Sequence, residues 1–536
     1  MHPVIDIAVW SILLLQGLAT EALSDRSEYL VEGLEHIEPA FAKFDGSMYA
    51  GLIPFDWKER QGNLMFWLFL PHKPSNEESL VMWLNGGPGC SSFDAGVAFE
   101  NGPVKIPSRP AGYCCSSTED PLEYNKYAWT HMAPMLYLEQ PAGTGFSDGP
   151  EPHTEKDLAG DMHSFLENFF VIFDDMLAKR LFIFGESYAG MFVPSIARQI
   201  YLKNQEDSTV TINLAGIALG NGWMDAQMQG PTVIDYAWWH GMIDTTTRTL
   251  LHGEWEKCIS PGNRMGAPLH QFTVPDECGI MAAVLQAAGK GLLSNRAPNT
   301  YDVTTWDTYP VLVSDDEQNT FVRFFNNNTV KEALHAPPDV EWRGCIPGAG
   351  RRRLMMLDQD RPLSVAPYLA QLMDDAKIRV LVYNGDRDMS TNSAGTELVL
   401  NGMKDWSGHG EWQAKTRGLW LDEKQEMAGW AKEFQRLSFV VVYNSGHLLP
   451  YNQPARALQL LERFLSNTSF VDLEIPRLEF ADTSVAEEKW HERMEGRMRI
   501  LVVGFVAFLI ICVGIYATVS HSRRRQEYST VSSESR

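Results

Sequence analysis

Six apolar runs, each followed by a loop of small and polar residues, constrain the fold more than any other feature of this sequence. Each run is continuous rather than alternating, which indicates a strand buried on both faces, as in a parallel sheet covered by helices. Helical patterns intervene between the runs, and strands that alternate with helices indicate an α/β fold. The runs lie at residues 80–89, 135–147, 180–190, 214–223, 378–388 and 438–447, and the helical patterns at residues 155–173, 191–204 and 455–465.

Residues 224 to about 340 interrupt this alternation with a segment that is richer in helix formers and loops. We interpret the segment as a helical insertion, or cap, over the top of the sheet. The 536 residues, 44% of them hydrophobic, are enough for one large core or two smaller ones. We expect residues 23–470 to form one folded domain that includes this insertion.

The N-terminus has the shape of a secretory signal peptide. An apolar run at residues 7–18 precedes small residues that end at Ala22, where we expect cleavage, so that residues 1–22 are removed. The residues before the run include Asp6 and no Lys or Arg, which leaves an uncleaved membrane anchor as the alternative.

A second apolar segment, residues 500–520, carries no charge and is long enough to cross a bilayer of ~30 Å as one helix. Residues 471–499 are charged and are interpreted as a stalk, and residues 521–536 as a short tail. Arginines flank the segment almost equally on both sides, so the positive-inside rule does not decide its orientation. The predicted signal peptide decides the orientation instead. We therefore expect a single-pass membrane protein with its domain in the lumen and its tail in the cytosol.

The composition excludes some classes of function. The charge balance is acidic, with 68 Asp and Glu residues against 45 Lys and Arg, and no basic stripe is interleaved with aromatic residues. Nucleic acid is therefore not an expected partner. The chain has no Cys-x-x-Cys pair and no His cluster with the spacing of metal ligands, so we expect neither a metal nor a cofactor.

Six cysteines lie outside the apolar C-terminal segment, as suits a secreted domain. Six cysteines allow fifteen pairings, so spacing alone assigns no disulfide. Two Asn-x-Ser/Thr sequences, at Asn327 and Asn467, are the glycosylation sites expected of such a domain.

Three polar residues with catalytic potential lie in the loops after predicted strands: Ser187, Asp388 and His447. Chemistry in α/β sheets gathers at the carboxyl ends of strands, and the order Ser, Asp, His is that of α/β-hydrolases. A histidine takes the proton that makes a serine nucleophilic, and a carboxylate holds that histidine in the required tautomer. The alternatives are a helix cap, a turn acid and a surface histidine, respectively. Asp386 competes with Asp388 as the acid.

The loops around the serine predict a nucleophile elbow and an oxyanion hole. The sequence GESYAG at residues 185–190 is a variant of the Gly-x-Ser-x-Gly elbow, in which the small Ala189 still permits the sharp turn. A tetrahedral intermediate needs two backbone N–H donors near its oxygen. We expect one from Tyr188, directly after the serine, and one from Gly87 in the glycine-rich loop at residues 83–92.

Seven motifs together resemble those of the serine carboxypeptidases, a family of the α/β-hydrolase fold. They extend from residue 83 to residue 450 and cover nearly the whole predicted domain. Within the family, the apolar C-terminal segment and residues 426–454 look most like the fungal Kex-type, pheromone-processing carboxypeptidases of the Golgi. The motifs are WLNGGPGCSS, EQPAGTGFS, GESYAG, IALGNGWMD, VKEALHAP, VYNGDRDM and YNSGHLLP.

The resemblance implies a binding site for the substrate's free C-terminal carboxylate. It would consist of Glu186, Glu100, Asn85 and the backbone of Gly86. Carboxylates repel one another, so the site works only if one acid is protonated and donates a hydrogen bond. Crowding two carboxyls raises the pKa of one of them, which favours activity in an acidic compartment.

The resemblance also implies two disulfides, Cys90–Cys345 and Cys258–Cys278. The first would tie the glycine-rich loop to the region before the strand that carries Asp388, and the second would close a loop within the insertion. Cys114 and Cys115 are adjacent in the sequence and remain unassigned.

The chain departs from the family's pattern at several positions. The spacing that leads to Glu100 is one residue longer than usual, which makes Glu100 less secure than Glu186. Thr391 stands where many members carry a free cysteine after the catalytic Asp, and Glu139 replaces the common Asp before Gln-Pro. None of these departures removes a catalytic atom.

The expected function is that of a membrane-anchored serine carboxypeptidase of the Golgi or trans-Golgi network. By the Kex-type resemblance it releases C-terminal Lys or Arg from peptides and propeptides. A carboxypeptidase of broad specificity, of vacuolar or lysosomal type, or an acyltransferase on the same fold is the enzymatic alternative. A non-catalytic, chaperone-like binding protein is the alternative from another class, and the intact set of Ser187, Asp388 and His447 argues against it.

Overall fold

The computed structural model describes residues 25–105, 122–206, 210–259, 279–290, 292, 297–307, 321–345 and 363–476. The predicted signal peptide, transmembrane segment and cytosolic tail lie outside these residues, as does most of the predicted stalk. In the part of the chain that the structure describes, no helix is both long and apolar enough to cross a membrane.

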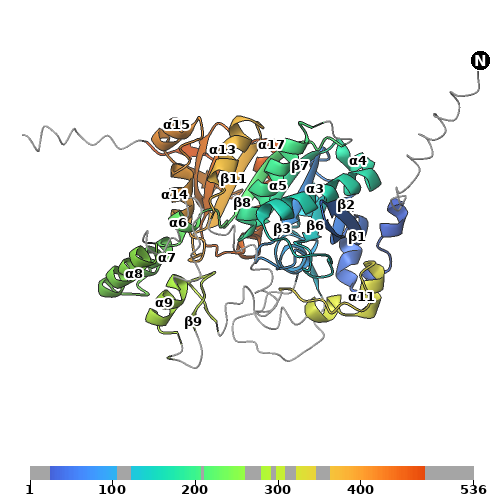
Figure 1. Ribbon diagram of the computed structural model, residues 1–536, viewed down its shortest axis with the longest axis horizontal. Helices are drawn as coiled ribbons and strands as arrows, with labels where there is room; N and C mark the ends of the chain where they lie inside the picture. The colour runs from blue at the N-terminus through green and yellow to red at the C-terminus, as the bar shows by residue number, and fades with distance from the viewer. Residues whose placement is uncertain are drawn as a thin grey trace, which may run out of the picture. The chain divides into compact units, whose positions relative to one another are not determined.

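An eleven-stranded sheet is the centre of the described structure, and its six middle strands are parallel (Figure 1). The six predicted apolar runs supply these strands, and almost every residue in them is buried, which confirms the predicted α/β fold. In spatial order the strands are β6 (Met135–Glu139), β3 (Ser79–Leu84), β7 (Arg180–Glu186), β8 (Leu214–Gly220), β11 (Arg379–Gly385) and β14 (Leu437–Val442).

Antiparallel strands extend the sheet at both edges. At one edge, β1 and β2 form a long hairpin in which Gly46 pairs with Pro71 and Trp57 with Arg60. Three further strands continue the sheet beyond β14 at the other edge. The flanking strands are β1 (Gly46–Trp57), β2 (Arg60–Pro71), β13 (Met427–Phe434), β12 (Gly418–Leu421) and β15 (Leu473–Glu474).

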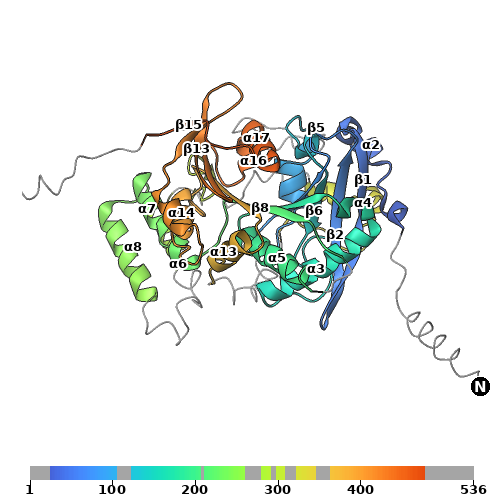
Figure 2. The same ribbon diagram turned by 90° about the horizontal axis from the view of Figure 1, so that it is seen from above.

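Helices cover both faces of the sheet (Figure 2). On one face, α3 (Glu155–Ile172), α5 (Ala189–Lys203) and α13 (Ala366–Asp374) pack against one apolar core. On the other face, α17 (Pro454–Ser466) and the π-helix η3 (Phe93–Glu100) pack against a second core. Strands between two helical layers are buried on both sides, which explains their uninterrupted apolar sequences.

The predicted insertion divides into two parts with different packing. Its first part, from α7 (Thr232–Trp239) through α8 (Thr245–Cys258) to α9 (Ile280–Ala287), has an apolar cluster of its own, which Met389 also joins. Its last part, around α11 (Asn328–Ala333), packs instead on the second core of the sheet. Figure 1 shows α11 at the opposite end of the described structure from α7 to α9.

The structure contains the predicted Cys90–Cys345 disulfide, which joins residues 255 positions apart in the sequence. Cys258 is disulfide-bonded as well. Its predicted partner, Cys278, lies outside the described residues, as do Cys114 and Cys115.

Candidate active site

Ser187 lies in a sharp turn between the end of β7 at Glu186 and the start of α5 at Ala189. Its φ angle is 62°, in the left-handed region that is strained for a residue with a side chain. Three backbone hydrogen bonds hold the turn: Ser187 N donates to Gly220 O (3.0 Å), and Trp223 N (2.9 Å) and Gly190 N (3.0 Å) both donate to Ser187 O. A strained strand-to-helix turn that presents a serine is the geometry of a nucleophile elbow.

The glycine-rich loop after β3 approaches this turn closely. A Cβ atom on Gly86 would lie 2.4 Å from Tyr188 N and 2.7 Å from Glu186 O, so only glycine fits there. The next residue, Gly87, has a φ of 109°, which L side chains rarely adopt. The fold thus places Gly86, the residue before Gly87, against Tyr188, and so brings the glycine-rich loop to the turn at Ser187 from the neighbouring strand.

Asp388 and His447 are paired by a hydrogen bond at the ends of two neighbouring strands. His447 Nδ1 lies 2.7 Å from Asp388 Oδ2, and the two residues are 2% and 0% exposed. His447 Nε2 is buried and has no hydrogen-bond partner among the described residues, which leaves it available to a reacting group. The competing acid, Asp386, accepts instead from Ser445 N at 3.1 Å.

Asp388 has further donors that the sequence analysis did not identify. Asn221 Nδ2 and Thr391 Oγ1 each donate to Asp388 Oδ2 at 2.7 Å, and Ser390 N donates to Asp388 Oδ1 at 2.8 Å. Asn221 directly follows β8, so the rule that marks polar residues at strand ends applies to it as well. Thr391 carries no comparable signal.

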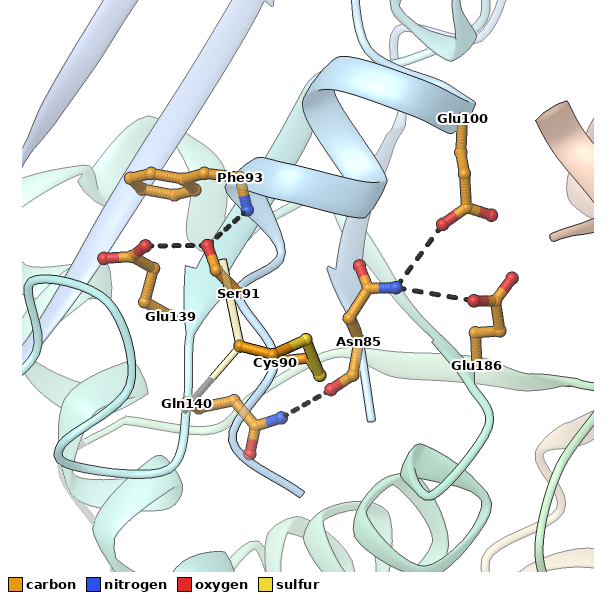
Figure 3. Close-up of a disulfide and its surroundings, with 9 residues drawn as sticks. Asn85, Cys90, Ser91, Phe93, Glu100, Glu139, Gln140 and Glu186 are labelled. Atoms are coloured by element: carbon orange, nitrogen blue, oxygen red, sulfur yellow. Dashed lines mark hydrogen bonds between the residues drawn. A yellow bond between two sulfur atoms is a disulfide. The ribbon is translucent and has the colours of Figure 1, made fainter. Parts of the chain in front are cut away.

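Glu100 and Glu186 face each other beside the elbow, and the side-chain amide of Asn85 points toward both from one side (Figure 3). Asn85 Nδ2 donates to Glu100 Oε1 at 3.4 Å and to Glu186 Oε1 at 3.5 Å. The second oxygen of each acid is buried without a partner among the described residues. The predicted carboxylate-binding residues Asn85, Gly86, Glu100 and Glu186 are therefore brought together.

The helix that leads to Glu100, η3, is a π-helix. Val97 N donates to Ser92 O and Asn101 N donates to Gly96 O, so each hydrogen bond spans five residues. A hydrogen bond of a π-helix spans one residue more than that of an α-helix. With these hydrogen bonds, η3 ends at Glu100 within reach of Asn85.

Burial governs the charge of this acid pair. Burial raises the pKa of Glu100 to about 7, although hydrogen bonds with Glu186 and Asn85 lower it in part. Burial raises the pKa of Glu186 well above its ordinary value, and the charge of Glu100 raises it further. The pair therefore holds at least one proton in acidic solution, as a site for a carboxylate requires.

Another buried acid, Glu139, supports the glycine-rich loop from its other side (Figure 3). Its carboxylate accepts from Ser91 Oγ (2.7 Å), from Trp342 Nε1 (2.6 Å) and from Phe146 N (2.6 Å). Ser91 follows the disulfide-bonded Cys90, so this network and the disulfide hold the same segment.

The two predicted glycosylation sites are both exposed. Asn327 is the N-cap of α11, and its side chain accepts from Thr329 N at 2.9 Å. Asn467 is the C-cap of α17, and its side-chain oxygen accepts from Arg379 Nη1 at 3.0 Å. Glycosylation of these residues remains a prediction.

Comparisons with known proteins agree with this geometry. The family model described as "Serine carboxypeptidase" matches residues 39–467. The pheromone-processing carboxypeptidase KEX1 of Phaeosphaeria nodorum is 31% identical over 463 residues, which cover 82% of this chain and 67% of that protein. The pheromone-processing carboxypeptidase kex1 of Aspergillus niger is 29% identical over 517 residues, which cover 90% of this chain and 80% of that protein.

A solved structure has the same fold. A crystal structure of KEX1(delta)p, a prohormone-processing carboxypeptidase from Saccharomyces cerevisiae, has a TM-score of 0.70 and 24% identity, and the match covers 83% of this chain and 97% of that one. The sheet order, the elbow and the family match together establish an α/β-hydrolase fold. The chain belongs to the serine carboxypeptidase family.

Proposed function

We propose that Ser187, His447 and Asp388 are the catalytic triad of this serine carboxypeptidase, with the N–H groups of Gly87 and Tyr188 as its oxyanion hole. The 2.7 Å hydrogen bond between His447 Nδ1 and Asp388 Oδ2, beside the strained turn at Ser187, is the observation that carries the proposal. It orients an imidazole whose other nitrogen has no partner among the described residues.

In the proposed reaction, Ser187 Oγ attacks the carbonyl carbon of the last peptide bond while His447 Nε2 takes the hydroxyl proton. The oxyanion hole stabilises the tetrahedral intermediate. The C–N bond then breaks, His447 returns the proton to the departing amino group, and the C-terminal residue leaves. A water molecule, activated by His447 in the same way, hydrolyses the acyl-enzyme and regenerates the serine.

The pair of Glu100 and Glu186, with Asn85 and the Gly86 backbone, is proposed to select substrates that end at the cleavage site. A protonated carboxyl of the pair donates a hydrogen bond to the substrate's terminal carboxylate, and the Asn85 amide donates another. An internal peptide segment offers no carboxylate and would leave these buried groups unpaired, which is costly. This accounts for removal of terminal residues rather than internal cleavage.

The proposed substrates are peptides and propeptides that end in Lys or Arg, and the proposed location is the Golgi or trans-Golgi network membrane. The support for the specificity is the likeness to proteins named as pheromone-processing carboxypeptidases. The disulfide supports an oxidising compartment. Residues 500–520 would anchor the protein, with the catalytic domain in the lumen.

The triad is tested with Ser187→Ala and a fluorophosphonate probe. Loss of the nucleophile typically lowers the rate by about 10⁴- to 10⁶-fold, and the full-length wild type should be labelled whereas the variant should not. More than a tenth of wild-type activity in the folded variant would rule out the assignment.

The specificity is tested with matched peptides that end in Arg, Lys, Leu or Phe, and with their C-terminal amides. We expect higher kcat/KM for Arg and Lys, and poor cleavage of the amides. A preference for Leu or Phe would favour the carboxypeptidase of broad specificity. Labelling of Ser187 without hydrolysis of any peptide would favour acyl transfer.

A further inference from the structure

The hydroxyl of Thr391 contacts both members of the proposed acid–base pair. Thr391 lies three residues after Asp388, in the loop between β11 and α14 (Ser393–Asn401). Its Oγ1 donates to Asp388 Oδ2 at 2.7 Å and lies 3.2 Å from His447 Nδ1. Since His447 Nδ1 is itself 2.7 Å from Asp388 Oδ2, the three atoms form a closed triangle.

The chemistry of a hydroxyl fits this position. A threonine hydroxyl has one proton to donate and lone pairs with which to accept. Its proton goes to Asp388, which accepts only, and a lone pair faces the N–H of His447 Nδ1. The triangle is satisfied only when the proton of the neutral imidazole is on Nδ1. Nε2 is then the basic nitrogen, as the reaction of Ser187 requires.

The surroundings of Thr391 fix its side chain in place. Its backbone oxygen accepts from Asn384 Nδ2 at 2.8 Å. The next residue, Asn392, is the N-cap of α14, and its side chain accepts from Gly395 N at 2.9 Å. Thr391 is 5% exposed, so water competes little for its hydroxyl. Asn221 donates to the same oxygen of Asp388, but the Thr391 hydroxyl also reaches His447.

We propose that Thr391 is a positioning residue of the catalytic machinery. Its hydroxyl holds the Asp388 carboxylate and the Nδ1-protonated imidazole of His447 in their relative positions. It also stabilises the imidazolium–carboxylate pair that forms when His447 takes the serine proton. The inference rests on the proposed triad. It concerns the rate of the chemical step and not the binding of substrate.

The test compares Thr391→Val, which removes the hydroxyl at nearly constant shape, with Thr391→Ser, which keeps it. In the full-length protein we expect kcat to fall about 10- to 100-fold in Thr391→Val with KM nearly unchanged, and Thr391→Ser to stay within a few-fold of wild type. Thr396→Val is the matched control. Thr396 is 0% exposed, lies on α14, and its hydroxyl has no partner among the described residues, so its loss should leave kcat unchanged.

Several outcomes would overturn the proposal. Wild-type kcat in Thr391→Val would do so, and so would equal losses in the Val and Ser variants, since packing rather than the hydroxyl would then matter. If thermal unfolding shows that Thr391→Val does not fold, Thr391→Ala against Thr391→Ser decides in the same way. Asp388→Asn distinguishes failure of the proposed triad from failure of the proposed role of Thr391. If Asp388→Asn stays active, the triad itself is refuted. If Asp388→Asn is inactive but Thr391→Val is fully active, only the role of Thr391 is refuted.

Discussion

Asn85 Nδ2 donates to two carboxyl groups at once, at 3.4 Å from Glu100 Oε1 and 3.5 Å from Glu186 Oε1. The amide oxygen of Asn85 accepts from Trp83 Nε1 at 2.7 Å, which sets the orientation of the amide so that its N–H groups point at the acids. One amide for two buried carboxyls leaves their remaining oxygens to share protons with each other or with a substrate.

Glu186→Gln should flatten the pH dependence of KM. In the wild type the acid pair holds a proton in acidic solution, and burial raises the pKa of Glu100 to about 7. As pH rises towards that value, negative charge accumulates beside the substrate's carboxylate, so KM should rise. Glutamine keeps an N–H donor without needing a proton. The measurement is KM from acidic to neutral pH with one peptide substrate.

Glu206→Gln is the control for this experiment, because the Glu206 side chain is 61% exposed and pairs with Lys203 rather than with the site. Its KM profile should follow that of the wild type. An identical profile in Glu186→Gln and wild type would contradict the shared-proton argument, whatever the absolute activity of the variant.

The parallel strands could be predicted because burial on both faces makes their sequences continuously apolar. Residues 64–70 of β2 form a continuous apolar run as well, so continuity alone also indicates this strand. The run ends at a proline rather than in a glycine-rich loop, and it is therefore not among the predicted strands. β1 has no continuous run, and it buries Met48 and Ala50 in the second core but Ile53 and Phe55 in the first, so its burial follows no single period along the strand. Its place at the edge depends on pairing with β2, which is a tertiary property.

The places of Ser187 and Asp388 could be predicted because both lie in loops after strands, whereas Asn85 is expected only from the resemblance to the family. The role of Thr391 could not be predicted, because it depends on how the loop after β11 turns its hydroxyl back toward Asp388. The position of Glu100 depends on the hydrogen-bond pattern of η3, and that pattern is not evident from residue spacing.

Gly86→Ala should impair catalysis strongly. The new Cβ would lie 2.4 Å from Tyr188 N, so the glycine-rich loop or the elbow must move away. Displacement of one oxyanion donor typically costs about 10²- to 10³-fold in kcat. The measurement is kcat together with thermal unfolding, which separates a displaced donor from a loss of folding.

Gly253→Ala is the matched glycine control. Gly253 lies inside α8, and a Cβ there would meet nothing within 4 Å. Alanine should leave kcat unchanged and stabilise the helix by roughly 0.5–1 kcal/mol. Wild-type kcat in a folded Gly86→Ala variant would show that the loop is not held against the elbow as the structure has it.

Asp94 is a buried acid on η3 that the proposed reaction does not use. Burial raises its pKa from 3.8 to about 7. Its Oδ1 has no hydrogen-bond partner among the described residues, and a Cβ on Gly344 would lie 2.2 Å from its Oδ2. Burial is the largest cause of the raised pKa of Glu139, and the charge of Asp94 raises that pKa further. Ionisation of Asp94 therefore opposes folding.

Asp94→Asn should make the free energy of unfolding depend less on pH. Between pH 3.8 and about 7 the folded wild type holds a proton that the unfolded chain has released, so the stability of the wild type falls as pH rises through this window. One such group contributes a slope of about 1.4 kcal/mol per pH unit, and roughly 4 kcal/mol over the whole window. The amide that replaces the Asp94 carboxyl does not titrate. The variant should therefore lose the contribution of Asp94 to the pH dependence of the free energy of unfolding, whatever its stability at acidic pH. The measurement is urea unfolding of the full-length protein from pH 4 to pH 8. Asp405→Asn is the control, because Asp405 is exposed and its replacement should leave the slope unchanged. Parallel curves for wild type and Asp94→Asn would contradict the prediction, because the pKa of Asp94 would then be the same in the folded and the unfolded chain.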